Sequence, residues 1–492
     1  MRVLKSKQIK LSLFYFISIG FILLNLWFVV KKDMLYLNAL PLVAALLLAA
    51  VYSFDKIIYL IVFFSPLSLP LSELSSGFGF DMYLPTEPLI FGLLIIFFLK
   101  ILQERKFDRR ILLHPVSLVI YLNLFWILIT SITSTMPLVS FKFLLMRIWF
   151  LAVLYFLTAK LFSQGKNMEK YVWLYVIPFM MVIFYATFRH LVYGLWDKQA
   201  SHFVVMPFFN DHTSYGASLA FYLPFLLMFV FDKSQSKRWR TFATFAFFVV
   251  LMGFVLSYSR AAWLSLLAAI GVWGILLLKI RFKTIFITVV TVGTLFFAFQ
   301  QQILMKLEQN SQESSAHLGT HISSMSNIST DASNLERINR WSCAIRMFQD
   351  KPVFGFGPGT YMFQYAPYQL TKERTIISTN AADGGNAHSE YLGPLSESGV
   401  LGLLTFLLII GVVLYTAINT YTRTTDPRLK KIVLVALLGL ITYYVHGFLN
   451  NFLDTDKLSV PFWGFTAMIV AIDIISRENP IRKSSINLTN AD

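Results

Sequence analysis

One long polar stretch, residues 301–397, separates runs of hydrophobic sequence and holds the side chains best suited to chemistry. His388, near its end, can accept a proton from a hydroxyl group, because an imidazole ordinarily titrates near neutral pH. Arg337 and Arg340 suit a phosphate or diphosphate, since a planar guanidinium stays charged and offers paired donors. We therefore interpret 301–397 as an active-site loop. The simpler alternatives are a solvated His388 and arginines that contact anionic lipid headgroups.

Arg260 is a second candidate, because it lies where the chain must turn at a membrane boundary. A continuous helix over 241–278 would be ~57 Å long, nearly twice the thickness of a bilayer core, so the chain must reverse near Arg260. An ionisable group in that position is costly and by default indicates a functional site. Arg147, within the apolar run 139–162, could likewise meet a lipid diphosphate from inside the membrane. Either arginine could instead extend to headgroup phosphates.

Three further groups carry weaker signals. Asp454 and Asp456 have the spacing of a metal-binding pair, but two carboxylates on a short loop are common by chance, and we expect no metal. His446 could pair with Asp454. Residues 209–213 could line a polar entrance. No phosphate-binding loop, nucleophile elbow or zinc motif is present, which removes most classes of soluble enzyme.

The composition is that of a membrane protein with many spans. The chain has 492 residues, of which 56% are hydrophobic and 14% charged, whereas soluble domains carry about 25% charged residues. The net charge of +16 does not indicate nucleic-acid binding, because the basic residues cluster in short loops between apolar runs. Residues 11–30 are as long as a span and no cleavage site follows them, so we expect no signal peptide. Cys343 is the single cysteine, so no disulfide can form within the chain.

The hydrophobic runs predict an all-α polytopic membrane protein with 12–14 transmembrane helices. Each span needs about 20 apolar residues. The weakest candidates are 36–54 and 57–71, the latter interrupted by Pro66 and Pro70. The fourteen candidate spans are 11–30, 36–54, 57–71, 84–102, 115–134, 139–162, 171–190, 214–231, 241–259, 261–278, 284–300, 399–420, 432–449 and 459–475.

The distribution of lysine and arginine predicts the orientation. Every alternate short loop is basic, which places both termini in the cytoplasm and 301–397 outside, in the periplasm of a bacterium. The chain then divides into about eleven spans in 1–300, the large loop, and 398–492 with three spans and a short cytoplasmic tail.

Within the loop, the sequence predicts one helix and two tight turns. Residues 309–334 are rich in Ser, Asn and Thr and are typical of a flexible lead-in. Ser333 and Glu336 fit a capping box at the start of a helix that Pro352 ends. Ile338, Trp341, Ile345 and Phe348 fall on one face, which predicts an amphipathic helix on the membrane surface with its apolar side down. Tight turns are expected at Gly355–Gly359 and Asp383–Asn386.

With these residues identified, the chain resembles the O-antigen ligase and polymerase family of bacterial envelope glycosyltransferases. The similarity covers about 205–415. Two features depart from it: Ser389 stands where an Asn is common, and fourteen spans exceed the twelve typical of the ligases. The motifs that carry the resemblance are Ser257–Trp263, Arg337–Trp341, Asp350–Gly359, Ala387–Leu392 and Glu397–Gly402.

The resemblance implies a GT-C-like architecture in the bacterial inner membrane, with an active site on the periplasmic face. Family members take a glycan from an undecaprenyl-diphosphate carrier; ligases pass it to lipid A-core and polymerases to a second lipid-linked glycan. It implies that Arg260 and Arg337 hold the diphosphate leaving group, and Arg340 and Arg147 are further candidates for the same role. His388 would take the proton from the acceptor hydroxyl, giving inversion without metal or cofactor.

Several alternatives stay open on the sequence alone. Ligase and polymerase share these motifs, and a protein-glycosylating relative would use the same chemistry. A transporter of lipid-linked oligosaccharides is the alternative from another class. Transporters typically show internal repeats and polar groups at mid-membrane, and neither is evident here. A receptor or scaffold is less favoured, because no folded soluble module is evident.

Overall fold

The computed structural model describes residues 15–16, 18–28, 30–31, 53–74, 82–104, 107–279, 332–375, 378–379 and 385–489. The chain forms two compact units, 1–58 and 59–492. In the first unit the described helix Ser18–Phe28 is apolar but shorter than a span. The predicted span 284–300 and nearly all of 36–54 lie outside the described residues, as does the lead-in up to 331.

Ten helices among the described residues are long and apolar enough to cross a membrane, which confirms an all-α polytopic protein. Proline at the first helical position and polar N-caps such as Asp211 and Ser259 mark where several of them begin. The ten are α5 (Thr86–Glu104), α7 (Pro115–Ile132), α8 to α9 (Pro137–Phe162, with a π-helical stretch at Leu151–Leu157), α10 (Met168–Tyr193), α12 (His212–Phe231), α13 (Lys237–Leu256), α14 (Arg260–Leu277), α19 (Leu392–Arg423), α20 (Pro427–His446) and α21 (Asp456–Thr489).

The predicted span 57–71 is wrong. Helix α3 ends at Phe64, a 3-10 turn covers Ser65–Leu67, and Leu69–Pro70 (β1) pairs antiparallel with Tyr83–Leu84 (β2). The two prolines explain the break, since proline cannot donate the backbone hydrogen bond that a helix interior requires. The short helix α4 (Leu71–Leu74) follows β1.

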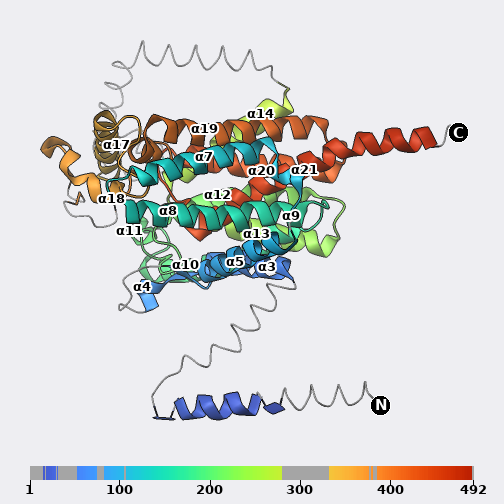
Figure 1. Ribbon diagram of the computed structural model, residues 1–492, viewed down its shortest axis with the longest axis horizontal. Helices are drawn as coiled ribbons and strands as arrows, with labels where there is room; N and C mark the ends of the chain where they lie inside the picture. Colours follow the sequence, from blue (N-terminus) through green and yellow to red (C-terminus); the bar gives the residue numbers. More distant parts are fainter. Residues whose placement is uncertain are drawn as a thin grey trace. The chain divides into compact units, whose positions relative to one another are not determined.

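Three helices form the centre of the bundle. The spans of α12, α20 and α21 are the most completely buried, and α20 packs against both of the others. By contrast α5, α7, α13 and α14 expose many large apolar side chains, including Phe98, Phe125 and Phe248. In water such a surface would be an aggregation liability, whereas in lipid it needs no further cover. The parallel arrangement of these long helices is visible in Figure 1.

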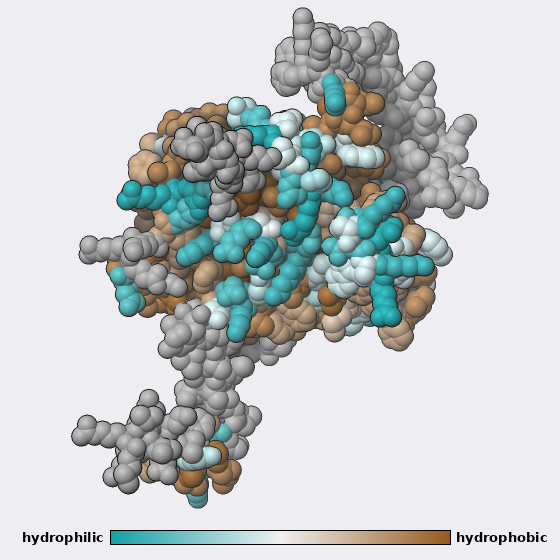
Figure 2. Space-filling model, turned by 90° about the vertical axis from the view of Figure 1, so that its right-hand side faces the viewer, coloured by the Kyte–Doolittle hydropathy of each residue, from teal (hydrophilic) through white to brown (hydrophobic). Residues whose placement is uncertain are grey.

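The two ends of the bundle differ in charge. The segment 332–397, with α17 (Ala332–Asp350) and α18 (Tyr361–Gln364), lies at one end, which we call the loop end (Figure 1). At the opposite end the basic loops are joined by ion pairs such as Arg110–Glu478 and Lys431–Asp232. Figure 2 shows that face, where hydrophilic side chains gather over the middle and apolar surface surrounds them.

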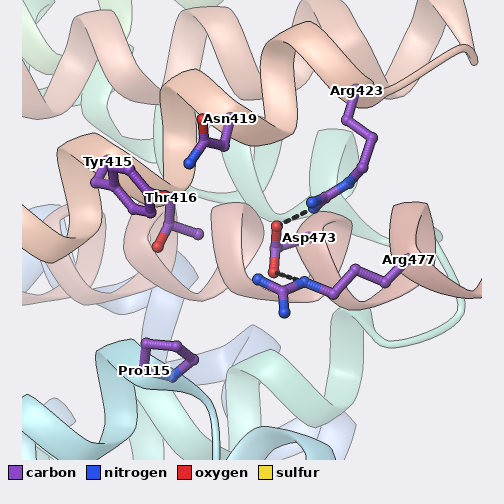
Figure 3. A pocket seen from close by; sticks show the side chains of 7 residues that line it. All are labelled: Pro115, Tyr415, Thr416, Asn419, Arg423, Asp473 and Arg477. Atoms are coloured by element: carbon purple, nitrogen blue, oxygen red, sulfur yellow. Dashed lines mark hydrogen bonds and ion pairs between the residues drawn. The ribbon is translucent and has the colours of Figure 1, made fainter.

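A buried carboxylate ties the helices together at this opposite end. Asp473 of α21 is 1% exposed and pairs with Arg477 at 2.7 Å and with Arg423 of α19 (Figure 3). The same carboxylate accepts a hydrogen bond from Thr420 at 2.7 Å and lies 3.1 Å from Nε2 of His114. A pocket of about 260 Å³ opens beside it, lined in part by Asn419.

Candidate functional site

The turn between α13 and α14 places Arg260 at the loop end. The predicted reversal is confirmed: α13 ends at Leu256 and α14 begins at Arg260, with the Ser259 hydroxyl oxygen accepting from the backbone N–H of Ala262 at 3.4 Å. The turn packs tightly on α12, because a Cβ on Gly216 would lie 2.7 Å from that of Ser259. Arg260 is half-buried at the positive end of a helix dipole, where a cation is disfavoured and an anion is favoured.

Helix α17 holds the two loop arginines in different environments. The Arg340 Nε donates to Glu336 Oε1 at 2.8 Å, and its guanidinium lies 4.8 Å from the centre of the Tyr365 ring. Both members of the ion pair are almost fully buried. Arg337, by contrast, is half-buried and lies close enough to His388 for its charge to act on the imidazole. The charges of both arginines act on His388, and Arg340 is also held in an ion pair by Glu336.

Glu336 is the centre of a hydrogen-bond network that fixes this part of the loop. Its Oε2 accepts from Thr375 Oγ1 at 3.0 Å and from the Ser378 hydroxyl. Burial raises the pKa of Glu336, but these hydrogen bonds and Arg340 outweigh it and hold the pKa below its ordinary value. The capping-box prediction is therefore wrong about the role of Glu336, and α17 includes Ser333 instead of starting after it.

Helix α17 is amphipathic, as predicted, but the face that it buries in the protein is not the predicted apolar face. Its buried face consists of Glu336, Asn339 and Arg340, which are polar, and of Cys343, Ala344 and Met347, which pack in one cluster with Tyr361 and Tyr365. The predicted apolar face does stay accessible, with Ile338 37% and Ile345 43% exposed. Contact of that face with a membrane stays a prediction.

A run of three glycines fastens the loop to the bundle. Gly355, Gly357 and Gly359 all have positive φ, which confirms the predicted tight turn. The backbone N–H of Gly357 donates to the Glu397 carbonyl at 2.7 Å. A Cβ on Gly357 would lie 1.9 Å from Ser134 Oγ, so this position accommodates only glycine without rearrangement.

His388 is held in a strained conformation at the end of the loop. Its φ is +47°, in the left-handed region, and its backbone N–H donates to Asn386 Oδ1 at 3.0 Å. Trp341 Nε1 donates to the His388 carbonyl at 3.2 Å. Burial, together with the charges of Arg337 and Arg340, lowers the pKa of His388 to about 4. The imidazole is therefore neutral near pH 7 and able to accept a proton.

Two more histidines, His212 and His446, join the site, and the sequence analysis did not name either of them as a catalytic or diphosphate-binding residue. His212 lies at the start of α12. It is close enough to Arg260 and Arg337 for their positive charges to influence its protonation. His446 lies at the end of α20, and the positive charge of Arg337 influences its protonation as well. Asp211 caps α12 and accepts from the backbone N–H groups of Thr213 and Ser214 at 3.0 and 2.7 Å. The polar segment 209–213 was the one signal that pointed to His212.

Arg147 lines a pocket beside the His388 loop, together with Asn386 and Ser389. Its Nη2 donates to Asp454 Oδ1 at 3.1 Å, and its guanidinium lies 5.2 Å from the centre of the Phe143 ring. The expected pairing of His446 with Asp454 is wrong, because His446 Nε2 lies 3.1 Å from Asn450 Nδ2. Asp456 does not act with Asp454 either. Its Oδ2 accepts from Ser68 and Thr86 at 2.7 and 2.5 Å.

Fold and site thus define a multi-pass membrane protein with arginines and histidines gathered at one end. Residues 245–407 match the family model described as O-antigen ligase, which confirms the resemblance for this part of the chain. The matched segment includes Arg260, Arg337, Arg340 and His388. The chain is also 22% identical over 258 residues, 52% of its length, to an uncharacterized protein of Haemophilus influenzae. It covers 62% of that relative.

Proposed function

We propose that this protein is an inverting glycosyltransferase that moves a glycan from an undecaprenyl-diphosphate carrier to an acceptor hydroxyl. Arg260 and Arg337 bind the diphosphate, and His388 accepts the proton of the attacking hydroxyl. The new bond forms between the acceptor oxygen and the anomeric carbon while the bond to the carrier diphosphate breaks. The diphosphate leaves with the electron pair, and the arginines offset its growing charge.

One observation carries the proposal: three segments far apart in sequence bring a neutral imidazole and two arginines to the same end of the bundle. Arg337 acts on His388, and Arg337 and Arg260 both act on His212. Arg260 starts α14, and the positive end of a helix dipole favours a bound anion. A diphosphate supplies that anion. Arg340, held by Glu336, supports the loop and does not contact the diphosphate in this proposal.

The loop end faces the periplasm in this proposal, in the inner membrane of a bacterium. The opposite end carries Arg110 in the short helix α6 (Arg109–Leu112) and Arg428 and Lys431 in the first turns of α20, and basic residues beside short connections are retained on the cytoplasmic side. A C-terminal fusion to green fluorescent protein should fluoresce, whereas a fusion to alkaline phosphatase should be inactive. The reverse result would contradict the orientation.

We propose ligation to lipid A-core as the reaction, with polymerisation of lipid-linked repeats as the alternative. The test uses purified protein in nanodiscs with an undecaprenyl-diphosphate oligosaccharide, with or without lipid A-core, in EDTA. A shifted lipid A-core band indicates a ligase, and a ladder of carrier-linked chains indicates a polymerase. Product that appears only after a divalent metal is added contradicts the arginine mechanism. A transporter would move the lipid-linked donor between leaflets without making either product.

A further inference from the structure

A second pocket lies beside the His388 loop and plays no part in the mechanism above. It has a volume of about 130 Å³ and lies between α8, the start of α19 and the connection from α20 to α21. Asn386, Ala387, Ser389 and Glu390, on either side of His388, all line it. The pocket is much larger than a water site and far smaller than a lipid chain requires.

Its charges disfavour a diphosphate. Arg147 is the only basic side chain among the lining residues, and its guanidinium is already paired with Asp454 at 3.1 Å. Glu390 and Glu397 add two more carboxyl groups to the lining. A phosphate group would meet more acidic than basic groups there, and one arginine neutralised by an aspartate does not offset that.

The pocket also presents one buried hydrogen-bond acceptor that has no donor among the described residues. Oδ1 of Asn451 is buried and accepts no hydrogen bond from any described residue. Glu390 is 7% exposed, and the hydrogen bonds from Tyr443 Oη and the backbone N–H groups of Phe452 and Leu453 all end on Oε1, at 2.6, 2.8 and 2.9 Å. Its Oε2 receives none of these. A buried acceptor without a hydrogen bond is costly, so Asn451 Oδ1 favours a ligand that brings a hydroxyl donor, and the carboxyl groups of the lining offer further acceptors.

The rest of the lining suits such a ligand. Phe143 and Tyr361 supply ring surface, and the Asn386 amide supplies a further polar group. A concave site with apolar walls and a few fixed polar groups is the usual form of a small-molecule site. An uncharged sugar ring offers hydroxyl donors to the carboxyl and amide oxygens and C–H faces to the rings.

We propose that this pocket binds one uncharged sugar residue of the glycan substrate through Asn451, Glu390 and the Arg147–Asp454 pair. The inference rests on the proposed transferase function and gives Arg147 a role other than the diphosphate contact expected from the sequence. Because the His388 loop forms one wall, a sugar held here positions the neighbouring part of its glycan near the reacting groups.

Direct binding is the first test, with protein in nanodiscs and saturation-transfer NMR on glucose, galactose and N-acetylglucosamine. Wild type should transfer saturation to at least one of them, and Asn451→Leu, which fills the pocket, should lower the signal about tenfold or more. Asn419→Leu makes the same change in the pocket of Figure 3, at the other end of α19, and should have no effect. Asn451→Ala, which removes the amide without filling space, is used if the leucine variant unfolds. No signal from wild type, or an unchanged signal in the folded variant, overturns the proposal.

Steady-state transfer then assigns the sugar to donor or acceptor. A tenfold rise in the acceptor KM of Asn451→Leu with an unchanged donor KM places the acceptor sugar in the pocket, and the opposite pattern places the donor sugar there. Wild-type values for both overturn the subsite while leaving the transferase function intact. If wild type shows no transfer at all, the proposed function fails, and the binding experiment still decides whether the pocket takes a sugar.

Discussion

Arg340 and Glu336 form a buried ion pair one helical turn apart on α17, and Arg337 lies between them in the sequence. The pair is 6% and 5% exposed, and Glu336 also holds Thr375 and Ser378. Two arginines that look equivalent in sequence are therefore different in the structure. Arg340 stabilises the loop, and Arg337 binds the diphosphate in the mechanism proposed above.

The two arginines should respond differently to the same substitution. Arg340→Gln leaves Glu336 buried without its partner and should destabilise the protein by about 3 kcal/mol or more. Arg337→Gln should leave the unfolding temperature nearly unchanged and lower glycan transfer by ~10²-fold, because a transition-state charge contact is lost. Thermal unfolding in detergent and turnover measure the two effects. Equal losses of stability in both variants would contradict this division of roles.

Arg260→Lys should lose most activity while the protein still folds. A lysine keeps the charge but cannot reproduce the paired donors of a guanidinium on a diphosphate. Turnover should fall ~10-fold or more with little change in unfolding temperature. Arg240→Lys is the matched control at the opposite end of α13, where Arg240 Nε donates to the Val230 carbonyl at 3.1 Å. Full activity in Arg260→Lys would mean that Arg260 only contacts lipid headgroups.

The pH dependence of kcat/KM should follow the protonation of His388 in the enzyme without substrate. Because its pKa is lowered to about 4, the imidazole is neutral and competent above that pH and becomes protonated as the pH falls through it. The rate should therefore stay level from about pH 8 to pH 5 and decline only below that range. Circular dichroism at each pH controls for unfolding. A decline centred near pH 6.5 would mean that this histidine is not shifted, or that another group is the base.

Asp473 should matter for stability and not for chemistry. Asp473→Asn removes the partner of Arg423 and Arg477 and should cost about 3 kcal/mol, since a buried carboxylate is replaced while both arginines remain. Glu478→Gln is the control, because the Glu478–Arg110 pair is about half exposed on both sides and should contribute less than about 1 kcal/mol. Thermal unfolding measures both. An unchanged unfolding temperature in Asp473→Asn would show that Arg423 and Arg477 find other partners.

Ten of the predicted spans and the turn at Arg260 could be predicted from the sequence, because bilayer thickness and helix rise restrict where a hydrophobic run must end, whereas 57–71 was wrong. The glycine turn at 355–359 was also predictable, since few residues tolerate positive φ. The failures concern packing between distant segments. The side of α17 that is buried depends on Tyr361 and Tyr365, and the partner of Arg340 depends on the local fold.

The sequence also did not show that His212 and His446 belong to the site. Each lies at the end of a hydrophobic helix, one at its start and one at its finish, where a polar residue is ordinary. Only the packing of α12 against α20 brings them toward Arg337. The expected pairing of Asp454 with His446 was wrong for the same reason, because the partner of Asp454 is Arg147, which lies within another span.

The most direct test of the account is the turnover of His388→Ala in the reconstituted transfer assay. Loss of a general base should lower turnover by ~10²–10⁴-fold, with donor binding and the unfolding temperature close to those of wild type. His317→Ala, the same substitution earlier in the polar stretch, should have no effect on transfer. Near-normal turnover by a correctly folded His388→Ala variant would contradict the central claim that His388 activates the acceptor hydroxyl.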